Sequence, residues 1–165
     1  MEPSIFRAVD KKEAARELLA MRERMEREIA DESDARYNSK LGRGGLVDVA
    51  FAVQFLQLVH GSSHPSIRTS STAAALAELR RIGLLAEAAA GPLARGYRFL
   101  RRVESRLRIV RDRAISHLPT SGRELVLLAR RLGYSGPRAG EELLADYESE
   151  TQSVRAAFLG VLEAA

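Results

Sequence analysis

Residues 40–54 read Lys-Leu-Gly-Arg-Gly-Gly-Leu-Val-Asp-Val-Ala-Phe-Ala-Val-Gln, and this stretch joins a basic, glycine-rich loop to the most apolar segment of the chain. No Gly-Lys-Ser/Thr follows the glycines, which excludes a Walker P-loop, and no strand precedes them, which excludes a dinucleotide-binding fingerprint. The segment from Leu46 to His60 is apolar almost all round, and such a helix is buried at the centre of a bundle. An ordinary turn between two helices remains the simplest interpretation of the loop itself.

The loop and the first turn after it nevertheless hold the residues most suited to binding. Glycines allow positive φ and close approach to another surface, two cations make the loop positive, and a first-turn carboxylate suits the positive end of the helix dipole. The candidate contacts to a nucleotide or to a catalytic domain are Lys40, Gly42, Arg43, Gly44, Gly45 and Asp48.

Nearly all of the remaining chain predicts helix, because Ala, Leu, Arg and Glu dominate it. No stretch shows the alternation of β-branched residues that indicates strands. We therefore expect an all-α, single-domain bundle of about six helices that spans residues 1–165. The expected helices begin near Asp10, at residue 46, at residue 70 or 71, near residue 85, at residue 120 or 121, and near residue 137.

Three local features of the sequence lead to further expectations. In the first helix, one charged face, which includes Arg22, lies opposite an apolar stripe made by Leu18, Met21, Met25 and Ile29. Gly91-Pro92 should break or kink the fourth helix early. The polar loop of residues 31–45 is long for a compact domain, which is typical of a functional or mobile segment.

Composition narrows the classes of function. Hydrophobic residues make up 45% of the 165 residues, and no apolar run reaches the length of a membrane span. Without a signal-peptide pattern, the expected compartment is the cytoplasm. The net charge of +4 suits an anionic partner, but the excess is modest and aromatic residues make up only 5%, so we expect neither nucleic acid nor membrane as a partner.

Metal and catalytic residues are not expected in this chain. It has no Cys. His60 and His64 are four residues apart, but Gly61 lies between them and no HExxH motif is present. No nucleophile has a base and an orienting carboxylate at a suggestive spacing. We therefore expect no catalytic residue, no metal ligand and no cofactor in the chain itself.

The run KLGRGGLVDVAFAVQFLQLVHG resembles the motif that opens the helical domain of glutamine synthetase adenylyltransferases, roughly K-x-G-x-GG-x-x-D-[IV]-E-[FW]-x-V-Q-x-L-Q-L. Twelve positions match, and Ala50 stands where that family usually has Glu. The resemblance continues through Ile67–Thr72, Gly96–Glu104, Asp112-Arg113, Leu118-Pro119 and Leu128–Tyr134, and so covers nearly the whole chain.

The resemblance implies a function in bacterial nitrogen regulation. In that family a nucleotidyltransferase domain precedes the helical domain, and its Asp-x-Asp pair holds Mg²⁺ and ATP. The complete enzyme attaches AMP from ATP to a tyrosine of glutamine synthetase, or removes it by phosphorolysis. This chain contains no Asp-x-Asp, so the isolated chain is expected to be inactive. Its implied partners are the nucleotidyltransferase domain and glutamine synthetase, with ATP and Mg²⁺ bound elsewhere in the enzyme.

Two other interpretations stay open at the level of sequence. The first is a non-catalytic binding module that docks an acidic partner protein through the basic stretch Arg95–Arg113 and the glycine-rich loop. The second is a purely structural bundle that buries an exposed apolar face in a dimer. The candidate partner surface is formed by Arg68, Arg98, Arg101 and Arg102.

Overall fold

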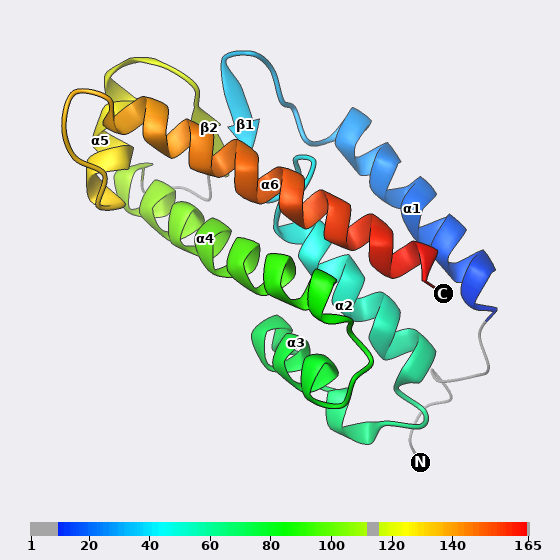
Figure 1. Cartoon of the computed structure of the whole chain (residues 1–165). Coiled ribbons are helices and arrows are strands. Elements are labelled where there is room, and N and C mark those ends of the chain that lie inside the picture. Colours follow the sequence, from blue (N-terminus) through cyan, green and yellow to red (C-terminus); the bar gives the residue numbers. More distant parts are fainter. Residues whose placement is uncertain (1–9, 112–115, 165) are drawn as a thin grey trace.

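The computed structural model describes residues 10–111 and 116–164 (Figure 1). These residues form six α-helices, one short 3-10 helix and one two-stranded sheet. The elements are α1 (Lys11–Glu28), β1 (Arg36–Asn38), α2 (Leu46–His60), η1 (Pro65–Ile67), α3 (Thr72–Arg81), α4 (Glu87–Arg111), β2 (His117–Pro119), α5 (Gly122–Arg131) and α6 (Ala139–Glu163). The expected all-α architecture is confirmed.

The two longest helices, α4 and α6, lie along each other and form the spine of the bundle (Figure 1). Helix α2 contacts α1, α3, α4 and α6, so it occupies the central position that its apolar sequence predicts. Helix α5 packs on α6 at the end of the bundle where the sheet also lies. The glycine-rich loop connects β1 to α2.

Local sequence signals fix several helix ends. Asp10 caps α1 by accepting hydrogen bonds from the backbone N–H groups of Lys12 and Glu13. Ser71 caps α3 through the N–H of Ala74. Helix α2 has the bounds that its apolar run predicts. The starts of α1 and α3 were predictable because a cap and its partner lie within three residues of each other.

Two expectations about local structure are wrong. First, β1 pairs antiparallel with β2, with Tyr37 opposite Leu118, although neither segment has a strand-like pattern. The pairing partners lie some eighty residues apart, so the ladder is set by tertiary packing. Second, the expected break at Gly91-Pro92 does not occur, because α4 continues through Pro92. A proline removes one intrahelical hydrogen bond, and the packing of this 25-residue helix against α6 outweighs that loss.

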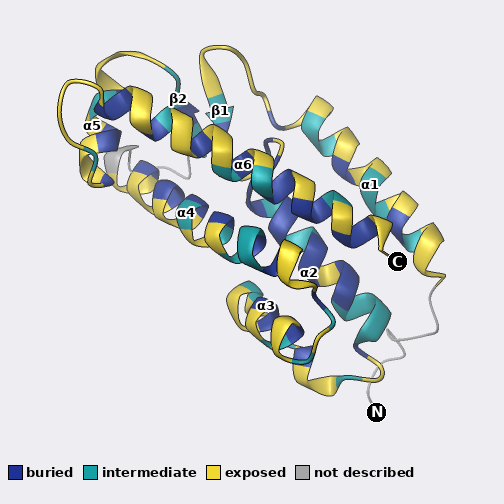
Figure 2. Ribbon diagram, in the orientation of Figure 1, coloured by how far each residue is buried: buried dark blue, intermediate teal, exposed yellow. Residues whose placement is uncertain are grey.

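The hydrophobic core consists of two clusters of buried side chains that run along the inner faces of the helices (Figure 2). The larger cluster centres on α2, with Val49, Phe55 and the α6 residue Phe158 almost fully buried. The second cluster joins the C-terminal half of α4 to α5 and the start of α6. Tyr97 is half-buried and packs against both clusters, so the core runs continuously along the spine.

Helix α1 is rotated relative to its predicted orientation. Met21 and Ile29 were expected on the buried stripe, but they are 48% and 54% exposed. Arg22, expected on the charged outer face, is completely buried. The physical reason for this rotation is an ion pair between Arg22 and a residue of α2.

Candidate functional site

The site is organised around Asp48, a fully buried carboxylate in the first turn of α2. Its Oδ1 accepts a hydrogen bond from Nε of Arg22 at 2.5 Å. Nη1 of Arg155, on α6, lies 3.3 Å from Oδ2. Glu26 completes the network, with Oε1 2.7 Å from Nη1 of Arg155 and 3.4 Å from Nη1 of Arg22. Two guanidinium groups and two carboxylates therefore balance in charge and tie α1, α2 and α6 together.

The same network holds the glycine-rich loop. The N–H of Gly44 donates to Oδ2 of Asp48 at 2.8 Å, and Nη2 of Arg22 donates to the carbonyl of Gly42 at 2.6 Å. Gly44 has φ +73°, and a Cβ atom there would lie 1.9 Å from the carbonyl oxygen of Thr151. The loop therefore passes directly over the α6 backbone, where only glycine fits.

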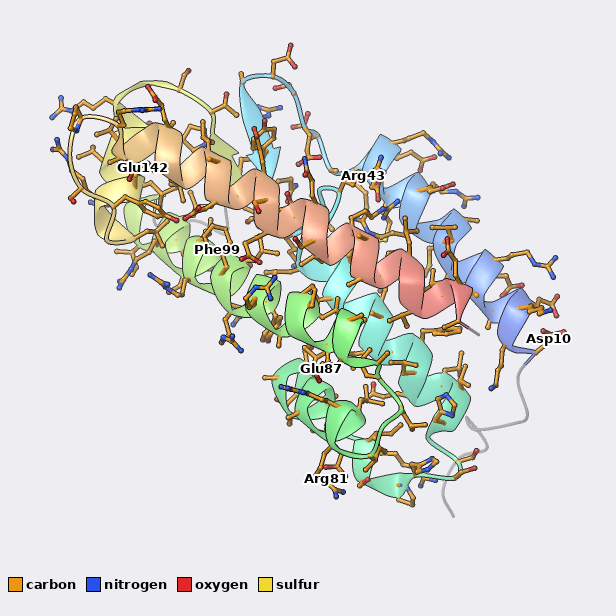
Figure 3. All side chains as sticks on the ribbon, viewed as in Figure 1. Asp10, Arg43, Arg81, Glu87, Phe99 and Glu142 are labelled. Carbon is orange, nitrogen blue, oxygen red and sulfur yellow. The ribbon has the colours of Figure 1, made fainter. Side chains whose placement is uncertain are left out.

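The two loop cations point away from this network. Lys40 and Arg43 are exposed, and neither side chain makes a hydrogen bond or ion pair within the described residues. Figure 3 labels Arg43 where the loop lies beside α6 and the end of α1. The structure thus divides the six predicted contacts into two groups. Asp48 and the glycines are buried and fix the loop, whereas the two cations are available to an outside group.

A cavity of about 420 Å³ lies beside Arg43, between the loop, β1 and α6. The rings of Tyr37 and Tyr147 stack in its wall, with centroids 5.4 Å apart. The hydroxyl of Tyr37 donates to Glu148, and this hydrogen bond raises the pKa of Tyr37. Burial raises the pKa of Tyr147. Both phenols therefore remain protonated at neutral pH, and the wall of the cavity combines aromatic, basic and acidic groups.

The four arginines predicted as a partner surface do not form one group. Arg68 follows η1, which Figure 1 shows well apart from the middle of α4, where the other three lie. Arg68 donates to the carbonyl of Gly61 at 2.7 Å. Arg101 pairs with Glu104 at 2.7 Å, and Arg102 donates to the carbonyl of Leu132 at 3.1 Å.

Of these four, Arg98 alone is exposed without a hydrogen bond or ion pair in the described part of the chain. Two residues of the resemblance near the end of the basic stretch, Asp112 and Arg113, lie outside the described residues. The role of these arginines in binding a partner stays a prediction.

Sequence reasoning missed Arg22 and Arg155, the two partners of Asp48. Arg155 is 7% exposed, and its guanidinium lies 5.5 Å from the centre of the Phe158 ring. One signal was present for Arg155: it lies among the apolar positions of α6, between Val154 and Phe158. Arg22 is followed directly by Glu23 and Arg24 in a stretch rich in charge, so the sequence offered no comparable signal.

The described residues contain no group of three His, Asp or Glu side chains that could hold a metal ion. None of the helices in the described ranges combines the length and the apolar character needed to cross a bilayer.

Comparison with known proteins places the chain in a family. A family model described as GlnD PII-uridylyltransferase matches residues 12–162. The bifunctional glutamine synthetase adenylyltransferase/adenylyl-removing enzyme of Streptomyces avermitilis is 41% identical over 145 residues, which are 87% of this chain and 14% of that enzyme. The enzyme of the same name from Streptomyces coelicolor is 37% identical over 144 residues, with the same coverage of both chains.

The corresponding Mycobacterium tuberculosis enzyme is 41% identical over 117 residues, or 71% of this chain and 12% of that enzyme. The chain thus spans about one seventh of the length of the Streptomyces relatives. The chain therefore belongs to the family described as GlnD PII-uridylyltransferase, and it corresponds to a helical domain of the glutamine synthetase adenylyltransferases.

Proposed function

We propose that this chain is the helical domain that supports a nucleotidyltransferase domain in transferring AMP from ATP to a tyrosine of glutamine synthetase, or in removing that AMP by phosphorolysis. The chemistry belongs to the nucleotidyltransferase domain, which would bind ATP and Mg²⁺. The helical domain would supply a rigid, basic loop at the edge of the catalytic cleft. Both the matching family and the names of the relatives support this assignment.

The observation that carries the proposal is the fixed loop conformation. The buried network around Asp48 holds the backbone of residues 42–48 from three helices. Lys40 and Arg43 are exposed on this fixed loop. A rigid support for two cations suits the binding of a phosphate group, because little conformational entropy is then lost on binding. It also places positive charge where a phosphoryl oxygen gains negative charge during transfer.

The test replaces the matching region of the Streptomyces avermitilis enzyme with this chain and measures attachment and removal of AMP on glutamine synthetase. We expect the chimera to be active. Changing Lys40 and Arg43 to Ala should lower kcat/KM at least about tenfold, since one charge-assisted hydrogen bond contributes on the order of 1.5–3 kcal/mol. The matched control changes two exposed cations of α5, Arg130 and Arg131, to Ala.

Two results would contradict the proposal. One is a chimera that is well folded but inactive in both directions while the parent enzyme is active. The other is an active chimera in which the loop variant and the α5 control behave alike, which would leave the loop cations without a role. Calorimetric titration of the isolated chain with ATP and Mg²⁺ should show no binding, because the nucleotide would be held by the other domain.

A further inference from the structure

Helix α2 is the central helix of the bundle, but one side of it is only partly covered by the other described elements. Val47, Ala50, Phe51 and Leu58 are half-buried, and Gln54 is exposed. At 100° per residue these five positions fall on one side of the helix, opposite Val49, Ala52, Phe55 and Leu56, which are buried. We name the five residues the open face of α2.

The open face lacks the charges of an ordinary solvated surface. The exposed side of α1 is rich in Arg and Glu, and that of α4 is rich in Arg. Helix α2, by contrast, contains one residue among Asp, Glu, Lys and Arg, and that residue is the buried Asp48. A helix that faces water normally carries a polar stripe, so an uncharged stripe of Val, Ala, Phe, Gln and Leu indicates a surface that another body covers.

The residues of the adenylyltransferase-like motif fall into two groups, those that pack within the chain and those that lie on the open face. Its glycines and Asp48 are buried and hold the loop, and Gln57 donates to the carbonyls of Ile67 and Thr69 at 2.7 and 2.8 Å. Packing and hydrogen bonding within the chain therefore account for these positions. Gln54 is different, because its side chain makes no hydrogen bond within the described residues.

Two further polar positions of the motif join Gln54 on this side. Lys40 is exposed, and its carbonyl accepts the N–H of Val47, so the basic loop leads directly onto the open face. Position 50, where the motif has Glu, lies within the face itself. The polar positions of the motif that the fold does not use are therefore collected on one surface.

We propose that the open face of α2, continued by Lys40, is the surface on which the nucleotidyltransferase domain is seated, and that Gln54 is its central hydrogen-bonding contact. This inference rests on the proposed function and names the surface through which it operates. The occupant follows from two observations. The relatives are about seven times longer than the region they share with this chain, and the face is contiguous with the loop proposed to reach the catalytic cleft.

The character of the face agrees with that occupant. An uncharged centre with a cation at its edge matches an interface between domains, in which apolar contacts lie centrally and charges lie at the rim. Helix α2 has 15 residues, or about 22 Å, which is long enough for one side of such an interface.

The experiment uses the same chimera of this chain in the Streptomyces avermitilis enzyme and compares two exposed positions. Gln54→Arg places a long cation in the centre of the open face. Ala145→Arg places the same cation at an exposed position of α6 that does not line the cavity beside Arg43. We expect Gln54→Arg to lower AMP transfer at least tenfold and to increase cleavage by trypsin between the two domains. Ala145→Arg should stay within twofold of the unchanged chimera in both measurements.

Thermal unfolding of the isolated chain is measured for both variants, and both should match the unchanged chain because both side chains are exposed. If the unchanged chimera is active and the two variants behave alike, the docking surface is wrong while the proposed function stands. If the unchanged chimera is folded but inactive, the proposed function fails and this inference fails with it. If Gln54→Arg alone destabilises the isolated chain, the face is packed within the chain and is not a docking surface.

Discussion

Replacing Asp48 with Asn would remove one negative charge from the buried network without changing the size of the side chain. In the native chain, Arg22 and Arg155 are balanced by Asp48 and Glu26. The variant would leave one net positive charge in a region where Arg22 is fully buried and Arg155 is 7% exposed. The carboxylate also accepts from Gly44, and a single amide oxygen cannot replace two carboxylate oxygens.

Removing one partner of a buried ion pair typically costs about 3–5 kcal/mol, because the remaining charge is uncompensated. A domain of this size is stable by only about 5–15 kcal/mol. We therefore expect Asp48→Asn to lower the unfolding free energy by about 3–5 kcal/mol. Urea titration followed by circular dichroism measures this change as a shift of the midpoint at constant slope.

The control is Glu87→Gln, which breaks the Arg80–Glu87 pair, whose side chains are 58% and 68% exposed. Its expected cost is less than about 1 kcal/mol. Adding Arg22→Met to Asp48→Asn should recover part of the loss, since Arg155 and Glu26 then remain as a neutral pair 2.7 Å apart. A cost for Asp48→Asn no greater than that of the control would show that the network does not stabilise the bundle in this way.

Gly44→Ala should cost about 2–5 kcal/mol, the sum of about 1–2 kcal/mol for a positive φ and about 1–3 kcal/mol for the collision with the Thr151 carbonyl. Gly83→Ala, at φ +76° with no atom within 4 Å, should show only the first cost, and equal losses by urea titration would contradict the reasoning. Burial, aided by Lys11 and His64, lowers the pKa of His60 below 6.5. The unfolded chain then binds more protons than the folded chain, so stability should be complete above pH 6.5 and should decline as the pH falls toward the folded pKa. His60→Gln should reduce this decline between pH 7.5 and 5.5, and an unchanged decline would assign it to other groups. Ala50→Glu should change the unfolding free energy by less than about 0.5 kcal/mol, since position 50 is half-exposed. A larger loss in thermal unfolding would show that the open face is packed within the chain.

The sequence by itself determined the helices and the central place of α2. The caps at Asp10 and Ser71 follow from residues within one turn of each other, and the bounds of α2 follow from its continuous apolar run. Helical hydrogen bonds and caps are local, so their pattern can be read along the chain. The family resemblance could also be recognised from the sequence, because its main motif occupies one continuous stretch.

The tertiary structure decided which candidate residues build the loop and which face outward. Asp48 meets Arg22 from 26 residues away and Arg155 from 107 residues away. Those contacts rotate α1, bury a charge expected at the surface and expose Met21. The energy of these contacts depends on the distance between segments that are remote in sequence and on their burial. A periodic pattern in the sequence contains no information on either quantity. For the same reason, only the tertiary structure identifies the pairing of β1 with β2 and the open face of α2.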